Sequence, residues 1–197
     1  MSSLLEDLKA DTLQLTSRIQ RNTRLIQAVD TLLSFSPYEK QSDENIVKLY
    51  QIARDNAVWT SLAILSDRTI TQLKNAGYMR LIDDPDVSNA IMEYEDRKKR
   101  LVDEGVDYEK SVGTINAVAT KLFDLVYLDE VAKRSVAGSP IPRLPTHVFE
   151  PAYFREFRND LFIENAENRL YLRYMKEVLE EARELIKVVE QAYSLGG

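Results

Sequence analysis

The sequence predicts an all-α fold, an elongated helical bundle of long antiparallel helices with a short helical corner. Three observations predict this fold. Apolar residues recur at steps of three and four along most of the chain, segments of alternating polarity are few, and only six glycines and six prolines interrupt 197 residues. With 44% hydrophobic and 29% charged residues, the chain is globular and long enough to bury a core. We therefore expect one bundle domain over residues 1–197.

The first long helix is expected over residues 1–34. Pro37 ends it, because proline cannot continue a helix. A heptad repeat that contains no charged residue runs along this helix and is typical of coiled-coil packing. Its members are Leu5, Leu8, Thr12, Leu15, Ile19, Asn22, Ile26, Val29 and Leu33.

A helical corner is expected next, within residues 67–105. A second helix that begins at Ser42 or Asp43 and runs to about Leu65 precedes it. The corner itself starts with a short helix that Ser66 or Asp67 caps. Gly77 ends that helix, since glycine adopts the left-handed conformation without strain.

Another long helix follows the corner, from Pro85 towards Ser135. Asp84 is the expected N-cap, with Pro85 at the first helical position. Residues 103–107 leave three interpretations open: a kink, a turn, or a glycine tolerated inside the helix. Residues 136–150 are rich in proline and are expected to form a surface loop.

The last long helix is expected over residues 151–194 and carries a second apolar seam. Long apolar seams bury the most area side by side, so the first and last helices should pack antiparallel. Leu5 and Leu8 would then lie near residues 186–193, and the proline-rich loop at the opposite, partner-facing end. The second seam consists of Leu172, Met175, Leu179, Ala182, Ile186, Val189 and Tyr193.

The composition excludes several kinds of chemistry. The chain has no cysteine and one histidine, His147, so it has no disulfides, no Cys-based zinc site, and too few imidazoles for a di-iron bundle. It also lacks the glycine-rich loops that bind nucleotides. A net charge of −6 argues against nucleic acid as a partner. We expect no enzymatic activity, no cofactor and no metal.

Two charged clusters invite a functional interpretation. The acidic cluster Asp83, Asp84 and Asp86 is either a calcium site or a helix start, and Pro85 favours the helix start. The bases at 97–100 are outnumbered by neighbouring acids, which favours a solvated helix face over a docking or anionic-lipid patch.

Aromatic and amide side chains give two further candidate sites. Asn22, Asn165 and Asn168 are polar residues on apolar helix faces. They either fix the register of the helices or bind a small molecule between them. Aromatic residues at the start of the last helix are either core or an interaction surface: Phe149, Tyr153, Phe154 and Phe157.

One stretch, residues 65–82 with the helix that follows, resembles a known family. It is similar to the soluble region of uncharacterised, membrane-tethered proteins of Bacteroidetes, which share an Arg-Thr-x-x-Gln-Leu-Lys-x-x-Gly turn followed by Arg-Leu-Ile. The aromatic pair expected near the end of the family's helix is looser here, since Glu95 follows Tyr94. The matching residues are Arg68, Thr69, Gln72, Leu73, Lys74, Gly77, Arg80, Leu81 and Ile82. From the residues themselves, Leu73, Leu81 and Ile82 are expected to anchor the turn, with Arg68, Lys74 and Arg80 paired to Asp83 or Asp86.

The resemblance implies a location and an architecture but no reaction. Family members carry a transmembrane helix before the soluble region, so we expect a tether outside residues 1–197 and a periplasmic or extracytoplasmic site at the inner membrane. The leading hypothesis is a non-enzymatic scaffold or interaction domain that binds a protein partner or itself. The alternative is a small-molecule-sensing helical bundle of a membrane receptor.

Overall fold

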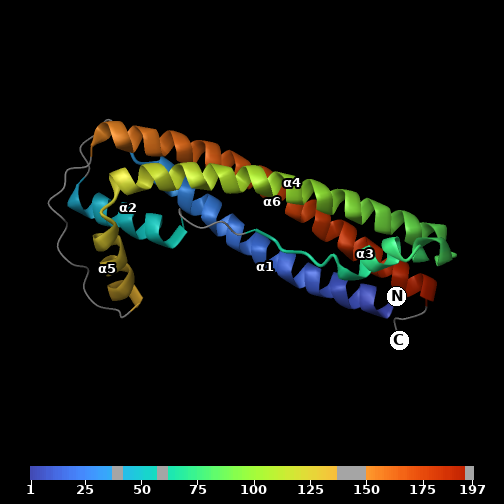
Figure 1. Cartoon of the computed structure of the whole chain (residues 1–197). Helices are drawn as coiled ribbons and strands as arrows, with labels where there is room; N and C mark the ends of the chain where they lie inside the picture. Colours follow the sequence, from blue (N-terminus) through green and yellow to red (C-terminus); the bar gives the residue numbers. More distant parts are fainter. Residues whose placement is uncertain (37–41, 57–61, 137–149, 194–197) are drawn as a thin grey trace. The chain divides into compact units, whose positions relative to one another are not determined.

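The computed structural model describes residues 1–36, 42–56, 62–136 and 150–193 (Figure 1). Its helices are α1 (Ser2–Leu33), α2 (Asp43–Asn56), α3 (Arg68–Asn75), α4 (Pro85–Leu122), α5 (Leu125–Val136) and α6 (Pro151–Tyr193). A 3-10 turn, η1, covers Tyr78–Leu81, and no strand occurs in these described ranges. The helices pack against one another, α1 and α4 both on α6. The prediction of an all-α bundle is confirmed.

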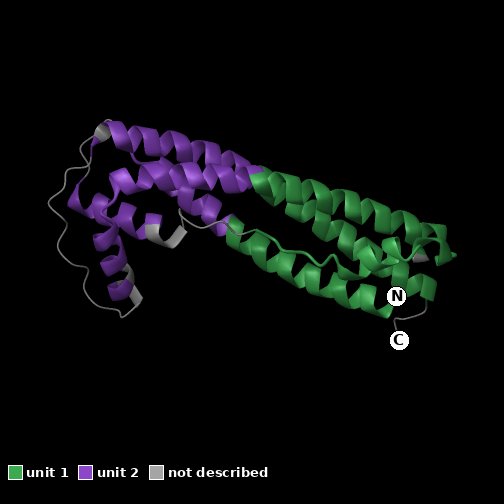
Figure 2. Cartoon of the chain, viewed as in Figure 1, with its two compact units in different colours: residues 1–22, 61–106, 170–197 green, residues 23–60, 107–169 purple. Residues whose placement is uncertain are grey.

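The contacts divide the chain into two compact units (Figure 2). Unit 1 contains residues 1–22, 61–106 and 170–197, and unit 2 contains residues 23–60 and 107–169. Each unit takes a part of α1, α4 and α6. The expectation that residues 1–197 fold as one domain stays a prediction.

Unit 1 packs α1 and α6 antiparallel, as their seams predict. The Lys9 ammonium lies 2.9 Å from a carboxylate oxygen of Glu190, and Asn22 contacts the sulfur of Met175. Residue numbers thus rise along α1 while they fall along α6. Leu5 and Leu8 are buried, whereas Tyr193 at the end of the second seam is 37% exposed.

Unit 2 has its core where α2 and α5 pack on the ends of the long helices. Three aromatic residues meet edge to face: Tyr50 contacts Phe123 and Tyr127 with ring centroids 5.0 and 4.9 Å apart. Arg158 of α6 donates a 2.6 Å hydrogen bond to the main-chain oxygen of Leu33, which binds the end of α1 to α6. The buried core is Val29, Leu32, Leu49, Tyr50, Ala53, Ile115, Val118, Ala119, Leu122, Phe123, Tyr127, Val131, Phe154, Phe157 and Leu161.

Residues 103–107 do not interrupt the helix, because α4 is continuous from Pro85 to Leu122. Gly105 is therefore the tolerated glycine among the three interpretations. A Cβ there would lie 3.4 Å from the ring of Tyr171, so glycine allows α6 to approach closely. The helix was expected to run towards Ser135 but ends at Leu122. Asp124 then caps α5, accepting hydrogen bonds from the amides of Val126 and Tyr127 at 3.0 and 3.1 Å.

The prediction that the second helix runs to Leu65 is wrong. Helix α2 ends at Asn56, and residues 62–67 have no helical structure. Their main-chain amides bind side chains of other helices instead: the amide of Ala63 donates to the Tyr171 hydroxyl at 2.8 Å, and that of Ile64 to Gln14 at 2.8 Å. These long-range bonds replace the bonds that a helix would have made.

Both predicted helix boundaries around the corner are confirmed. Gly77 has φ +68° and follows the last turn of α3. Asp84 caps α4 before Pro85, since its Oδ1 accepts a 2.9 Å hydrogen bond from the amide of Asp86. Asp67 precedes α3, but its side chain makes no capping bond. Its carboxylate lies 2.6 Å from the Lys98 ammonium.

Candidate functional site

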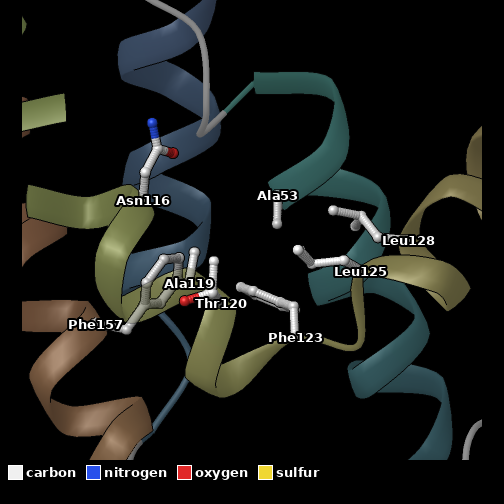
Figure 3. Close-up of a pocket in the computed structure, with 8 residues that line it drawn as sticks. All are labelled: Ala53, Asn116, Ala119, Thr120, Phe123, Leu125, Leu128 and Phe157. Atoms are coloured by element: carbon white, nitrogen blue, oxygen red, sulfur yellow. The ribbon is translucent and has the colours of Figure 1, made fainter. Parts of the chain in front are cut away.

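The candidate site is an apolar pocket in unit 2, with a volume of about 230 Å³ (Figure 3). Helix α2 contributes one wall, α4 another, and the start of α5 and one ring of α6 complete it. The break after α4 creates this space, because α5 begins at Leu125 instead of continuing the long helix. The lining residues are Ala53, Asn116, Ala119, Thr120, Phe123, Leu125, Leu128 and Phe157.

Rigid aromatic packing supports the pocket from behind. Phe123 contacts Phe157 edge to face, with ring centroids 5.3 Å apart, and also contacts Tyr50. The Tyr50 hydroxyl accepts a 2.8 Å hydrogen bond from the amide of Asp124, which fixes the break between α4 and α5. Burial raises the pKa of Tyr50 to about 12, so its hydroxyl is neutral at physiological pH.

The pocket offers almost no polar surface to a guest. The Thr120 hydroxyl donates to the carbonyl of Ala117 at 2.9 Å within its own helix. The Oδ1 atom of Asn116 is buried and has no hydrogen-bond partner among the described residues. Because this atom has almost no exposed surface, a guest in the pocket does not reach it. The chemistry that fits is apolar contact.

Exposed apolar residues include one that lines the pocket and others close to lining residues in the sequence. Leu125, which lines it, is 52% exposed, and its neighbour Val126 is 79% exposed. Tyr153 on α6 is 40% exposed, with the Lys121 ammonium 5.8 Å from its ring centre. A pocket with an apolar rim is typical of a binding surface.

The aromatic residues predicted at the start of α6 divide between core and surface. Phe154 and Phe157 are 3% and 1% exposed, so they belong to the core, and Phe157 also lines the pocket. The interpretation of these two as an exposed interaction surface is corrected accordingly. Tyr153 lies at the surface, while Phe149, His147 and the proline-rich loop lie outside the described residues.

The residues of the family motif form the corner of unit 1. Thr69 donates its hydroxyl to Asp7 of α1 at 2.5 Å, and its main-chain amide donates to the same carboxylate at 3.3 Å. This carboxylate from another helix takes the capping role that Asp67 does not fill. The hydrogen bond from the Thr69 side chain is the main factor that lowers the pKa of Asp7.

The predicted pairing of the motif's basic residues with Asp83 or Asp86 is wrong for two of them. Arg68 pairs with Asp7 at 3.7 Å, and Lys74 pairs with Glu95 at 2.8 Å. Leu81 is also not a buried anchor, because it is 70% exposed. Ile70, which the motif interpretation did not single out, is the buried apolar residue of α3.

A buried polar cluster that sequence reasoning missed holds residues 63–67 in place. Asp11 is 4% exposed and accepts hydrogen bonds from the amide of Ser66 and the hydroxyl of Tyr94, both at 2.9 Å. Lys98 is 6% exposed, donates to the carbonyl of Ser66 at 3.1 Å, and pairs with Glu95 at 2.7 Å. The expectation of a solvated face at 97–100 is therefore wrong for Lys98.

This cluster is electrostatically balanced. Burial raises the pKa of Asp11, although the hydrogen bonds from Ser66 and Tyr94 stabilise its charge and oppose that rise. Burial opposes the charge on Lys98, but its contacts with Asp67 and Glu95 prevail and raise its pKa. The sequence carries little sign that these side chains are buried. Asp11 lies close to the polar Lys9 and Thr12, and Lys98 lies inside a run of charged residues. We interpret the cluster as structural, because its polar groups bind one another.

In the described part of the chain, no group of three or more His, Cys, Asp or Glu side chains is placed to hold a metal ion. None of the helices in the described ranges combines the length and the apolar character needed to cross a bilayer. No protein-family model, no curated protein and no solved structure matches this chain.

Proposed function

We propose that this chain is a non-enzymatic protein-interaction domain of a membrane-tethered protein, and that the pocket of unit 2 receives an apolar side chain of the partner. The observation that carries the proposal is the pocket with its exposed rim, Leu125 and Val126. Its volume of about 230 Å³ is below the ~300–1,000 Å³ of small-molecule sites, which favours one or two side chains as the guest.

The lining also supports a protein as the guest. Hot spots in protein interfaces are apolar or aromatic anchors in water-excluded pockets, surrounded by contacts of smaller effect. Rigid walls from Phe123 and Phe157 match that arrangement.

Site-specific cross-linking of the full chain in its native cells tests the proposal. A photoreactive benzophenone amino acid at Val126 should yield an adduct with a partner protein, because Val126 is 79% exposed and follows Leu125, which lines the pocket. The matched control is Lys133 on the same helix, whose side chain is 74% exposed. An adduct of twice the chain's mass identifies self-association. Equal adducts from both positions, or none from either, would contradict the proposal.

The proposed location is extracytoplasmic, at the inner membrane. The similarity of residues 65–82 to membrane-tethered proteins of Bacteroidetes supports it, and the tether would lie outside the 197 residues. Protease added to cells whose outer membrane is opened should digest the chain while a cytoplasmic marker survives. Protection of both would contradict this location.

The second candidate function is a sensor for a small molecule, and the apolar lining of the pocket favours it. The guest would be a compact apolar molecule, because the lining of the pocket is apolar. Such a ligand should shift the Ala53 and Ala119 methyl signals in NMR spectra of the purified chain. The Ala182 methyl, buried in unit 1, is the internal control.

A further inference from the structure

Three buried polar residues within about one helical turn interrupt the apolar stripe of α6 inside unit 2. Glu164 and Asn165 are each 5% exposed and Asn168 is 0% exposed. Leu161, one turn earlier on the same stripe, is also 0% exposed but apolar. Residues spaced by three and four lie on one helix face, so the three polar side chains share one side of α6.

The neighbouring helices satisfy only part of this cluster. The Asn165 Nδ2 donates a 2.8 Å hydrogen bond to Asp30 of α1, and the Tyr108 side chain of α4 lowers the pKa of Glu164 against the effect of burial. Glu164 Oε2, Asn165 Oδ1 and both polar atoms of the Asn168 carboxamide are buried without a hydrogen-bond partner in the described part of the chain. Native proteins leave few buried polar atoms unbonded.

We propose that Tyr108, Glu164, Asn165 and Asn168 form an internal polar site in unit 2 that binds water together with one exchangeable proton. A buried water makes about three hydrogen bonds to polar groups that lack other partners. The Asn168 carboxamide supplies both a donor and an acceptor. A protonated Glu164 adds a donor, so the site is best satisfied when Glu164 is neutral.

The electrostatic surroundings support this assignment. Burial raises the pKa of Glu164 from 4.5 to about 7, and the Tyr108 side chain opposes that rise. From α4 the group that faces Glu164 is Tyr108. On α1 the acid that contacts the cluster is Asp30, which binds Asn165 and whose charge is paired with Arg169 of α6 at 2.7 Å. No charged side chain contributes to the raised pKa of Glu164.

The stability of the fold should decrease with rising pH through the titration of Glu164. The pKa of Glu164 is raised in the folded chain, so its proton stabilises the fold fully below pH 4.5 and this contribution is lost as the pH rises through about 7. Each unit of pKa difference is a tenfold change in the unfolding equilibrium, so the total is on the order of 100-fold.

Denaturant unfolding of the full chain at pH 5 and pH 8 tests whether Glu164 holds a proton in the folded chain. The parent chain should be less stable at pH 8 than at pH 5. Glu164→Gln keeps the shape of the side chain but cannot release the proton. Its loss of stability should therefore be smaller than the parent's, by a factor on the order of 100 in the unfolding equilibrium constant. The exposed Glu109→Gln on α4 is the control and should behave as the parent does. The same fall in Glu164→Gln as in the parent would overturn the proposal.

Two further measurements keep the proposal testable if Glu164→Gln folds poorly. Carboxyl ¹³C NMR of the parent chain should show Glu164 titrating near pH 7, and a midpoint near the ordinary 4.5 would overturn the assignment. A crystal structure at acidic pH should show ordered water within hydrogen-bond distance of the Asn168 carboxamide. A dry carboxamide there would overturn the water site.

Discussion

The Tyr94 hydroxyl donates a 2.9 Å hydrogen bond to the carboxylate of Asp11, which joins α4 to α1 inside unit 1. Tyr94 is 0% exposed and Asp11 4%. Burial is the main factor that raises the pKa of this tyrosine, so it acts as a permanent donor. The other oxygen of Asp11 binds the amide of Ser66. Asp11 thus holds a helix and a non-helical segment in one register.

Replacing Asp11 with alanine should destabilise the fold by about 3 kcal/mol, because it leaves the Tyr94 hydroxyl, the Ser66 amide and the Lys98 charge with fewer partners. Chemical denaturation measures the change. Glu6→Ala, at an exposed position on α1, should change stability by less than about 0.5 kcal/mol. Equal effects of the two substitutions would show that the Asp11 bonds contribute nothing.

Gly77→Val should destabilise the fold by about 1–2 kcal/mol, since Gly77 has φ +68° and a β-branched residue is strained there. No atom lies within 4 Å of the added Cβ, so the backbone alone causes the loss. Gly113→Ala is the matched control: Gly113 is exposed inside α4 with open space around it, and alanine should add about 0.5–1 kcal/mol. Denaturant midpoints measure whether Gly77→Val lowers the stability of the fold and Gly113→Ala raises it.

Phe123→Ala should destabilise the fold by about 3–5 kcal/mol, because Phe123 is 4% exposed and its ring contacts both Tyr50 and Phe157. Phe162→Ala removes the same ring from a position that is 67% exposed and should cost less than about 0.5 kcal/mol. Thermal or denaturant unfolding compares them. A small effect at Phe123 would mean that the rear wall of the pocket is not packed as described.

Stability should fall in acid partly through Asp7. The Thr69 hydrogen bond lowers the pKa of Asp7, so the ionised carboxylate stabilises the fold above its ordinary value of 3.8, and this contribution is lost as the pH falls through the lower pKa of the folded chain. Asp7→Asn should therefore lose less stability than the parent between pH 5 and the acid limit. The exposed Asp96→Asn should lose as much as the parent.

The sequence predicts the helices well because their apolar spacing is local. The seam of α1 and the cap at Asp84 depend on neighbours within a turn or two, and Gly77 depends on its own lack of a side chain. The antiparallel packing of α1 and α6 also follows from the seams. Each of these features has a signature within a few residues.

Features that depend on distant partners could not be predicted in the same way. Residues 62–67 leave the helical conformation because Tyr171, Gln14 and Asp11 bind their amides from other helices. Lys98 is buried because Asp67 and Glu95 meet it, although its neighbours in the sequence are charged. The pocket arises from the break at Phe123, where the local pattern predicts a longer helix.

The measurement that tests the proposed function most directly is cross-linking from Val126 in a chain whose pocket is blocked. Thr120 is exposed and lines the pocket, so Thr120→Trp should fill it with little strain in the core. Thr114→Trp, at another exposed position on α4, is the matched control. We predict that the partner adduct is lost in Thr120→Trp and retained in Thr114→Trp, with both chains folded by circular dichroism. An undiminished adduct in Thr120→Trp would contradict the claim that the pocket of unit 2 receives the partner.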